Sequence, residues 1–211
     1  MFKDRQDAGR QLSLALEKFR APRPVILGLP RGGVVVGAEV ARALDGDLDV
    51  VLVKKLRAPG NPELALGAVS EDGRAYWNRE VTGLIGVAET YLQEEVAERR
   101  AELASQQQRY RAARPRIPLT GRTVILVDDG LATGATMIAA VQATAIAQPA
   151  RLIVAVPVSP PEVARRIGEM EQVTEFICLD TPWGFQGVGQ FYDDFTQVED
   201  ETVIEILKEF A

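Results

Sequence analysis

Residues 124–136 constrain the fold of this 211-residue chain more than any other segment. Residues 124–127 are apolar and mostly β-branched, a pattern that predicts a fully buried strand. Asp128 and Asp129 follow at the carboxyl end of this strand, and a turn of small residues at 132–136 then leads into an apolar run. In an open α/β sheet, ligands bind in the crevice beyond the carboxyl ends of the strands. The segment therefore predicts both the class of fold and the place of a binding site.

The turn and the acid pair predict two different ligand groups. Backbone N–H groups and the hydroxyls of Thr133 and Thr136 can converge on one anion, and the following helix adds its positive end, which suits a phosphate. Asp128 and Asp129 repel a phosphate, so we expect them to hold hydroxyl groups or a cation. A phosphate site beside a diol or metal site predicts a sugar phosphate as the ligand.

Strand and helix patterns alternate on both sides of this segment. Short apolar runs predict further strands at residues 25–29, 49–53, 151–157 and 173–179. Apolar residues at helical spacing predict helices at residues 4–19, 34–44, 137–147, 161–170 and 200–210. Strands that alternate with helices predict an α/β fold with an open, mainly parallel, doubly wound sheet.

The middle of the chain departs from this alternation. Residues 54–62 are basic and rich in Pro, Gly and Asn, which predicts an exposed mobile loop. Glu71-Asp72-Gly73 lies between apolar runs at 64–70 and 74–78, and this pattern predicts a hairpin that can hold the loop over a neighbouring site. Residues 86–114 predict a long charged helix, which is either a solvated cover helix or a dimer contact.

Composition excludes several classes of function. The net charge of −6 argues against a nucleic-acid-binding surface, and no apolar run reaches the ~20 residues that span a bilayer, so we expect neither partner. The single cysteine, Cys178, fits a reducing compartment and predicts a cytoplasmic protein. The absence of histidine excludes Ser-His-Asp and Cys-His triads and histidine-ligated zinc. A metal would be a hard cation on oxygen ligands, with Mg²⁺ the natural partner of phosphates.

The order of residues in the central segment resembles the signature of type I phosphoribosyltransferases. That signature has an apolar strand, two acids, two variable residues, and then a small residue, Thr, Gly, a small residue and Thr. Residues 29–33 are similar to the family's pyrophosphate loop, and residues 54–62 with their hairpin to the flexible loop that closes over the active site. The aromatic segment at 180–195 lies where the family places part of its base-binding hood, and the long helix resembles that of an uncharacterised bacterial subgroup.

The resemblance implies one phosphoribosyltransferase domain over residues 1–211, with a core at about 22–179 and a hood at about 180–211, helped by residues 1–20. It implies transfer of the 5-phosphoribosyl group from phosphoribosyl pyrophosphate (PRPP) to a nitrogenous base or another nitrogen nucleophile. The reaction releases pyrophosphate, and Mg²⁺ is the expected cofactor. The question of whether the protein forms a homodimer is left open. The alternative is a non-catalytic regulatory or accessory module that binds PRPP or a nucleotide.

The resemblance also implies roles for individual residues. Asp128 and Asp129 would engage the ribose hydroxyls of PRPP, close to the Mg²⁺ ion, as catalytic residues. The cradle for the 5′-phosphate corresponds to Ala132, Thr133, Gly134, Ala135 and Thr136. The pyrophosphate would contact Arg31, Gly32 and Gly33. When the loop closes, it would also contact Lys54, Lys55 or Arg57. Among these, Arg31, Lys54 and Lys55 are the catalytic candidates.

The acceptor is the part of the implied function that the sequence leaves open. Its predicted hood carries four aromatic residues that either stack on the acceptor or pack the hood itself: Trp183, Phe185, Phe191 and Tyr192. Many 6-oxopurine transferases have an aspartate before the Thr-Gly pair, where this chain has Ala132. The turn is closer to the adenine-type sequence, which weakens a hypoxanthine–guanine assignment without establishing an adenine one.

Overall fold

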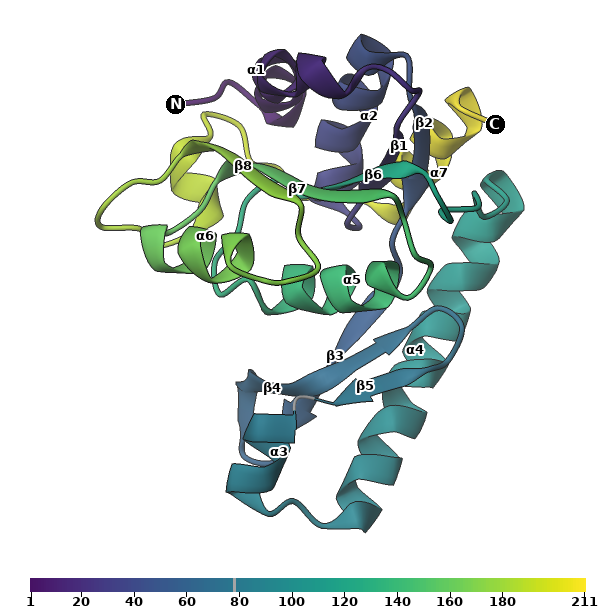
Figure 1. Cartoon of the computed structure of the whole chain (residues 1–211), viewed down its shortest axis with the longest axis vertical. Coiled ribbons are helices and arrows are strands. Elements are labelled where there is room, and N and C mark those ends of the chain that lie inside the picture. The colour runs from purple at the N-terminus through teal and green to yellow at the C-terminus, as the bar shows by residue number, and fades with distance from the viewer. Residues whose placement is uncertain (78) are drawn as a thin grey trace.

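A parallel five-stranded sheet forms the centre of the chain, and the computed structural model describes residues 1–77 and 79–211 (Figure 1). From one edge to the other, the strands are β2 (Asp47–Val50), β1 (Val25–Gly28), β6 (Thr123–Val127), β7 (Arg151–Val158) and β8 (Glu175–Asp180). All neighbouring strands run parallel. The predicted open, mainly parallel sheet is confirmed.

Helices cover both faces of this sheet (Figure 1). On one face α1 (Arg5–Leu16) packs on α2 (Gly32–Leu44), and on the other lie α5 (Ala135–Ala145) and α6 (Pro161–Gly168). Side chains of a strand point alternately to its two faces. Ile125 and Val127 of β6 therefore join one core, and Val124 and Leu126 join the other. The β6 run is apolar throughout because both of its faces are buried, as in other doubly wound sheets.

A smaller antiparallel sheet lies below α5 in Figure 1, in the order β3 (Val53–Ala58), β4 (Asn61–Ser70) and β5 (Ala75–Trp77). The hairpin predicted around Asp72-Gly73 is confirmed, because β4 and β5 pair across it. Gly73 has a φ of +76° and donates from its N–H to the Ser70 carbonyl at 2.8 Å. The predicted second strand ended at Asn78, which lies outside the described residues.

The prediction of a mobile loop at residues 54–62 is wrong. Residues 54–58 belong to β3, which pairs with β4, and only Pro59 and Gly60 form the turn between the two strands. Leu56 and Ala58 are buried in the core, whereas Lys54 and Lys55 are half-buried. β3 is an edge strand, and charged residues are common on such edges because they prevent pairing with other chains. The basic residues therefore lie on a strand, and the breakers Pro59 and Gly60 mark only its end.

The remaining helices are α3 (Arg79–Ile85), α4 (Glu89–Ala113) and α7 (Asp200–Glu209), with short 3₁₀ turns at Glu17–Phe19 and Val188–Phe191. Helix α4 confirms the predicted long helix, whereas α3 was not predicted. Helix α4 packs against β3, β4 and α7, and α7 also contacts α2. Among the described helices, none has the length and apolarity required to cross a membrane.

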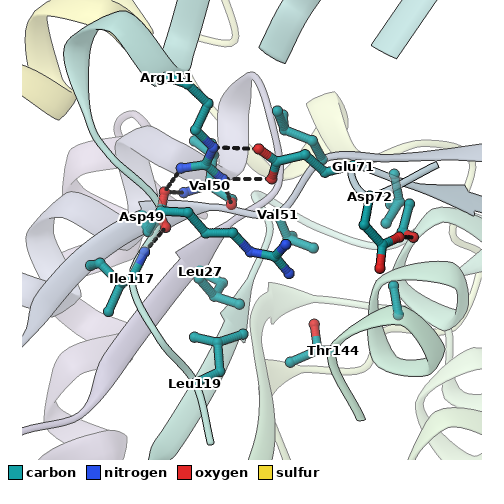
Figure 2. A pocket seen from close by; sticks show the side chains of 15 residues that line it. Leu27, Asp49, Val50, Val51, Glu71, Asp72, Arg111, Ile117, Leu119 and Thr144 are labelled. Atoms are coloured by element: carbon teal, nitrogen blue, oxygen red, sulfur yellow. Dashed lines mark hydrogen bonds and ion pairs between the residues drawn. The ribbon is translucent and has the colours of Figure 1, made fainter. Parts of the chain in front are cut away.

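An ion network joins α4, the small sheet and the central sheet (Figure 2). Arg111 near the end of α4 donates to Asp49 Oδ1 of β2 at 2.5 Å and, from Nε and Nη2, to the Glu71 carboxylate at 2.5 and 2.7 Å. Asp49 is only 1% exposed, and its Oδ2 accepts from the Ile117 N–H at 3.0 Å. The network fixes the hairpin, and with it Lys54 and Lys55, relative to the central sheet.

Replacing Arg111 tests the structural weight of this network. Arg111→Met leaves the buried Asp49 carboxylate without its ionic partner, so we expect the free energy of unfolding to fall by about 3–5 kcal/mol. Arg100→Met is the matched control on the same helix, because Arg100 is exposed and, within the described part of the chain, donates only to the Gly73 carbonyl. For Arg100→Met the free energy of unfolding should fall by no more than about 0.5 kcal/mol. Urea unfolding measures both, and equal losses would contradict the interpretation.

Candidate active site

The loops that follow β1 and β6 lie side by side at the carboxyl edge of the central sheet. The chain leaves β1 toward β2 on one side and leaves β6 toward β7 on the other, so the order of strands switches between β1 and β6. Such a switch point is the usual ligand crevice of an open α/β sheet. The Leu29 N–H donates to the Val127 carbonyl at 2.9 Å and so holds the two loops together.

Asp128 and Asp129 form a half-buried pair just beyond β6. Asp128 Oδ1 accepts from the Asp129 N–H at 2.9 Å, and Asp129 Oδ2 accepts from Arg5 Nε at 2.6 Å. Burial raises the pKa of the Asp128 carboxyl well above its ordinary value, and the charge of Asp129 raises it further. Burial also raises the pKa of Asp129, against which the hydrogen bond and charge of Arg5 act. Arg5 thus neutralises one member of the pair.

Gly32 and Gly33, at the start of α2, let the loop after β1 pack directly on the acid pair. A Cβ atom on Gly32 would lie 1.9 Å from Asp129 Oδ2, and one on Gly33 would lie 2.6 Å from the Val127 carbonyl oxygen. Neither glycine has a positive φ. Their close approach is therefore to the acid pair itself, and it places Arg31 next to the carboxylates.

The turn at 132–136 opens α5 and faces solvent. Gly134 caps the helix with a φ of +72°, and a Cβ atom there would lie 2.7 Å from Val163 Cγ1. Thr133 and Thr136 are exposed, and the Thr133 carbonyl accepts from Arg166. The first N–H groups of a helix lack partners within it, so this exposed start is suited to an anion.

Two cavities that share Pro30 are lined by some of the predicted site residues, whereas Gly33, Ala132, Thr133, Gly134 and Ala135 line neither. The first, of about 470 Å³ and here named the acid cavity, is lined by Arg5, Pro30, Arg31, Gly32, Asp128, Asp129, Phe195, Gln197 and Val198. The second, of about 240 Å³ and named the lysine cavity, is lined by Leu29, Pro30, Val51, Leu52, Val53, Lys54, Lys55, Gln106 and Thr136. Pro30 lines both. A third cavity, around Arg111 in Figure 2, is much smaller at about 40 Å³.

The four aromatic residues predicted for the hood do not line the acid cavity. Tyr192 is buried, and its hydroxyl donates to the Asp129 carbonyl at 2.6 Å. Phe185 and Phe191 stack on each other with ring centroids 5.3 Å apart, and Trp183 is 90% exposed. Tyr192 therefore anchors the hood to the acid loop. The role of these residues in acceptor binding stays a prediction.

Arg57 lines neither cavity, unlike the two lysines before it. Its N–H donates to Glu95 Oε1 at 3.0 Å and its carbonyl accepts from the Tyr91 hydroxyl at 3.1 Å, so α4 holds its backbone. The register of β3 against β4 shifts at Leu56/Arg57. The basic cluster read from the sequence is thus divided between the lysine cavity and the side covered by α4.

Sequence reasoning missed the residues that complete the acid cavity. These are Arg5 from the start of α1 and Phe195, Gln197 and Val198 from the loop before α7. The Arg5 guanidinium carbon lies 3.9 Å from the centroid of the Phe195 ring. No local signal distinguishes Arg5 from other charged residues of an amphipathic helix, since its partner Asp129 lies 124 positions away.

The sequence model of the phosphoribosyl transferase domain matches residues 6–192. The chain belongs to this family. Arg5 and the loop at 195–198 lie outside the matched range, so part of the acid cavity of this phosphoribosyltransferase domain is formed by residues beyond the two ends of the match.

The phosphoribosyltransferase domain is similar to proteins from mycobacteria and Thermus. Two proteins, from Mycobacterium tuberculosis strains CDC 1551 and H37Rv and provisionally named phosphoribosyl transferases, are each 43% identical over 208 residues. The match covers 98% of this chain and 46% of each relative, so the chain spans about half of their length. The crystal structure of TT1426 from Thermus thermophilus is 48% identical, with a TM-score of 0.91 and coverage of 100% of this chain and 99% of that one.

The two acids should respond unequally to neutralisation. A raised pKa means that ionised Asp128 costs the folded state free energy above that pKa, and the cost vanishes below the ordinary value of 3.8. We expect Asp128→Asn to raise the free energy of unfolding at pH 7 by about 1 kcal/mol, and this gain to shrink on acidification.

Asp129→Asn is the matched comparison, because it removes the carboxylate that pairs with Arg5. Burial raises the pKa of Asp129 too, but the lost Arg5 pair opposes the benefit of neutralisation, so we expect a smaller gain in the free energy of unfolding than for Asp128→Asn. Urea unfolding from pH 7 down to pH 4 measures both variants. A gain for Asp129→Asn that equals or exceeds the gain for Asp128→Asn, or a gain for Asp128→Asn that does not change with pH, would contradict the charge assignment.

Proposed function

We propose that the chain is a PRPP-dependent phosphoribosyltransferase. In this reaction a nitrogen atom of the acceptor forms a bond to C1 of the ribose, and the bond from C1 to the pyrophosphate oxygen breaks. Pyrophosphate leaves with both electrons of that bond, and the proton of the acceptor nitrogen passes to a base or to solvent. The products are a phosphoribosylated acceptor and pyrophosphate.

One observation carries the proposal: the acid pair, the loop at Arg31-Gly32 and the turn at 132–136 follow neighbouring strands, and the acid pair, this loop and Thr136 of the turn line two cavities that share Pro30. The parts of PRPP have matching chemistry. Its 5′-phosphate suits the exposed start of α5, and its ribose diol suits the carboxylates of Asp128 and Asp129. Its pyrophosphate suits the cations nearby. Membership of the family supports the same assignment.

The cations that we assign to the leaving pyrophosphate are Arg31 in the acid cavity and Lys54 and Lys55 in the lysine cavity. Positive groups placed where negative charge develops stabilise the transition state. Arg31 Nη1 lies 3.2 Å from Glu199 Oε2, an exposed ion pair that the pyrophosphate would replace. Such surface pairs contribute about 0–1 kcal/mol, so little free energy is lost in this exchange.

The acid pair is also chemically suited to Mg²⁺. Carboxylate oxygens are the hard ligands that this ion prefers, and it usually keeps waters and phosphate ligands as well. Among the described residues, no group of three or more Asp, Glu, Cys or His is placed to hold a metal alone. Asp128 and Asp129 therefore fit an ion that takes most ligands from PRPP and water. When bound, Mg²⁺ supplies charge neutralisation at the pyrophosphate.

Titration of the protein with PRPP in the presence of Mg²⁺ tests the site. We expect binding by the wild type and at least about a tenfold loss in the variant Asp128→Asn/Asp129→Asn, because two charged acceptors of the ribose hydroxyls are removed. Asp45→Asn is the control, since Asp45 is an exposed acid at the end of α2 and should leave the affinity unchanged. A double variant that binds as tightly as the wild type would overturn the site assignment.

Pyrophosphate release with a panel of bases and other nitrogen nucleophiles then tests the reaction. Release with at least one acceptor supports a transferase. PRPP binding without release across a broad panel favours a non-catalytic regulatory or accessory module instead. No binding of PRPP by the wild type contradicts both forms of the proposal.

The division of the basic cluster gives a second test with a built-in control. Lys54→Met and Lys55→Met remove cations that line the lysine cavity, so each should raise the Kd for pyrophosphate by about three- to tenfold. Arg57→Met removes a neighbouring cation that lines neither cavity and should leave this Kd unchanged. Calorimetry with pyrophosphate and Mg²⁺ measures all three. A loss at Arg57 equal to that at the lysines would contradict the placement.

A further inference from the structure

Arg5 makes three contacts that join the acid pair to the loop before α7. Its Nε donates to Asp129 Oδ2 at 2.6 Å, its Nη1 donates to the Thr196 carbonyl at 2.8 Å, and its guanidinium carbon lies 3.9 Å from the centre of the Phe195 ring. The Arg5 side chain is only 11% exposed. A planar fork of donors that also stacks on an aromatic ring is a geometry that arginine alone can provide.

The loop held by Arg5 is tied to the N-terminal segment at several further points. The N–H groups of Asp193 and Asp194 each donate at 2.9 Å, to the carbonyls of Phe2 and Lys3 respectively. Phe2 also packs on Tyr192, with ring centroids 5.4 Å apart. Residues 2–5 and 192–196 therefore form one unit, here named the terminal clasp. Arg5 is the side chain through which the clasp reaches the Asp129 carboxylate.

Arg5 and Phe195 are the residues of the clasp that line the acid cavity, and the Phe195 ring is packed against its neighbours. The Arg5 guanidinium covers the ring, and Tyr192 lies against it with a centroid separation of 5.0 Å. Phe195 also lies close to Gly189, where an added Cβ atom would be 3.0 Å from its Cδ1. A molecule in the acid cavity thus meets the carboxylate of Asp129 and the guanidinium that holds it.

Arg5 donates to Oδ2 of the Asp129 carboxylate, and we take Oδ1 of the same carboxylate as the oxygen that a ligand would contact. Without Arg5, this carboxylate could rotate, and burial would make its negative charge less stable, because burial raises the pKa of Asp129 and Arg5 opposes that rise. A bound hydroxyl on Oδ1 would in turn restrain the carboxylate, then the guanidinium, and then the Thr196 carbonyl. The carboxylate is linked to the guanidinium by the hydrogen bond from Arg5 Nε to Oδ2. The guanidinium is linked to the Thr196 carbonyl by the hydrogen bond from Nη1.

We propose that Arg5 is a positioning residue that couples donor binding at Asp129 to the order of the terminal clasp, which lies within the segments predicted to form the acceptor hood. The inference rests on the proposed function, since it takes PRPP as the molecule that binds Asp129. It assigns this chain a device formed by residues outside the matched family range, namely Arg5, Phe195 and Thr196. It also distinguishes Arg5 from a residue that only holds α1 in place.

The test compares three variants with the wild type: Arg5→Gln, Arg5→Lys and the control Arg10→Gln. Arg10 lies on the same helix, is 55% exposed, and approaches carboxylates only at 3.8 and 4.0 Å. Calorimetry measures the affinity for PRPP with Mg²⁺. Hydrogen exchange with and without saturating PRPP measures protection of the amides at 192–198, a readout that a purely structural role would not couple to ligand.

We expect PRPP to slow exchange at residues 192–198 in the wild type and in Arg10→Gln. In Arg5→Gln the Kd should rise about tenfold, as for loss of one charge-assisted hydrogen bond, and the slowing should disappear even at saturation. Arg5→Lys keeps a cation beside Asp129 and should recover part of the affinity. Because an ammonium group lacks the planar fork, this variant should not recover the protection.

The outcomes separate this inference from the function on which it rests. A wild type that does not bind PRPP overturns both. A wild type that binds PRPP while Arg5→Gln keeps its affinity and the full protection overturns only the role of Arg5. If Arg5→Gln does not fold, Arg5→Lys decides alone, and full protection on PRPP binding in that variant contradicts the proposal.

Discussion

The site depends on keeping two adjacent carboxylates half-buried at the end of β6. Burial raises the pKa of both acids, and the structure offsets this cost through Arg5 and through the Asp129 N–H, which donates to Asp128. Gly32 packs against the same Asp129 carboxylate with no room for a Cβ atom. The acid pair therefore requires a glycine at position 32 and a cation from α1, which is Arg5. A ligand that binds the two carboxylates and stabilises their charge would offset the free energy that their burial costs.

Much of the fold follows from local pattern. The apolar runs at β1, β6 and β7 are buried on both faces, so their composition alone indicates strands of a parallel sheet. The acid pair and the turn at 132–136 could also be placed, because carboxyl ends of parallel strands share one edge and Gly134 opens α5 as a left-handed cap. These features are contained within a few consecutive residues. Local information was sufficient for them.

Features that depend on distant partners could not be predicted in the same way. The basic residues 54–57 resemble a loop until β4 is known to pair with them and α4 to cover one side. Arg5 has the pattern of a solvated helix residue, yet it is buried against Asp129 and Phe195 from two later parts of the chain. The orientation of the hood aromatics also depends on distant partners. The Tyr192 hydroxyl donates to the Asp129 carbonyl, whereas Phe195, which was not predicted, lines the cavity. Which aromatic faces a site is decided by tertiary packing rather than composition.

The most direct measurement of the central claim is a crystal structure of the protein with PRPP and Mg²⁺. The account predicts the ribose hydroxyls within hydrogen-bond distance of Asp128 and Asp129, the 5′-phosphate on the turn at 132–136, and the pyrophosphate beside Arg31. Arg5 should still contact Asp129 Oδ2 in that complex. A ribose bound away from the acid pair, or a 5′-phosphate held by Lys54 and Lys55 in place of the turn, would contradict it.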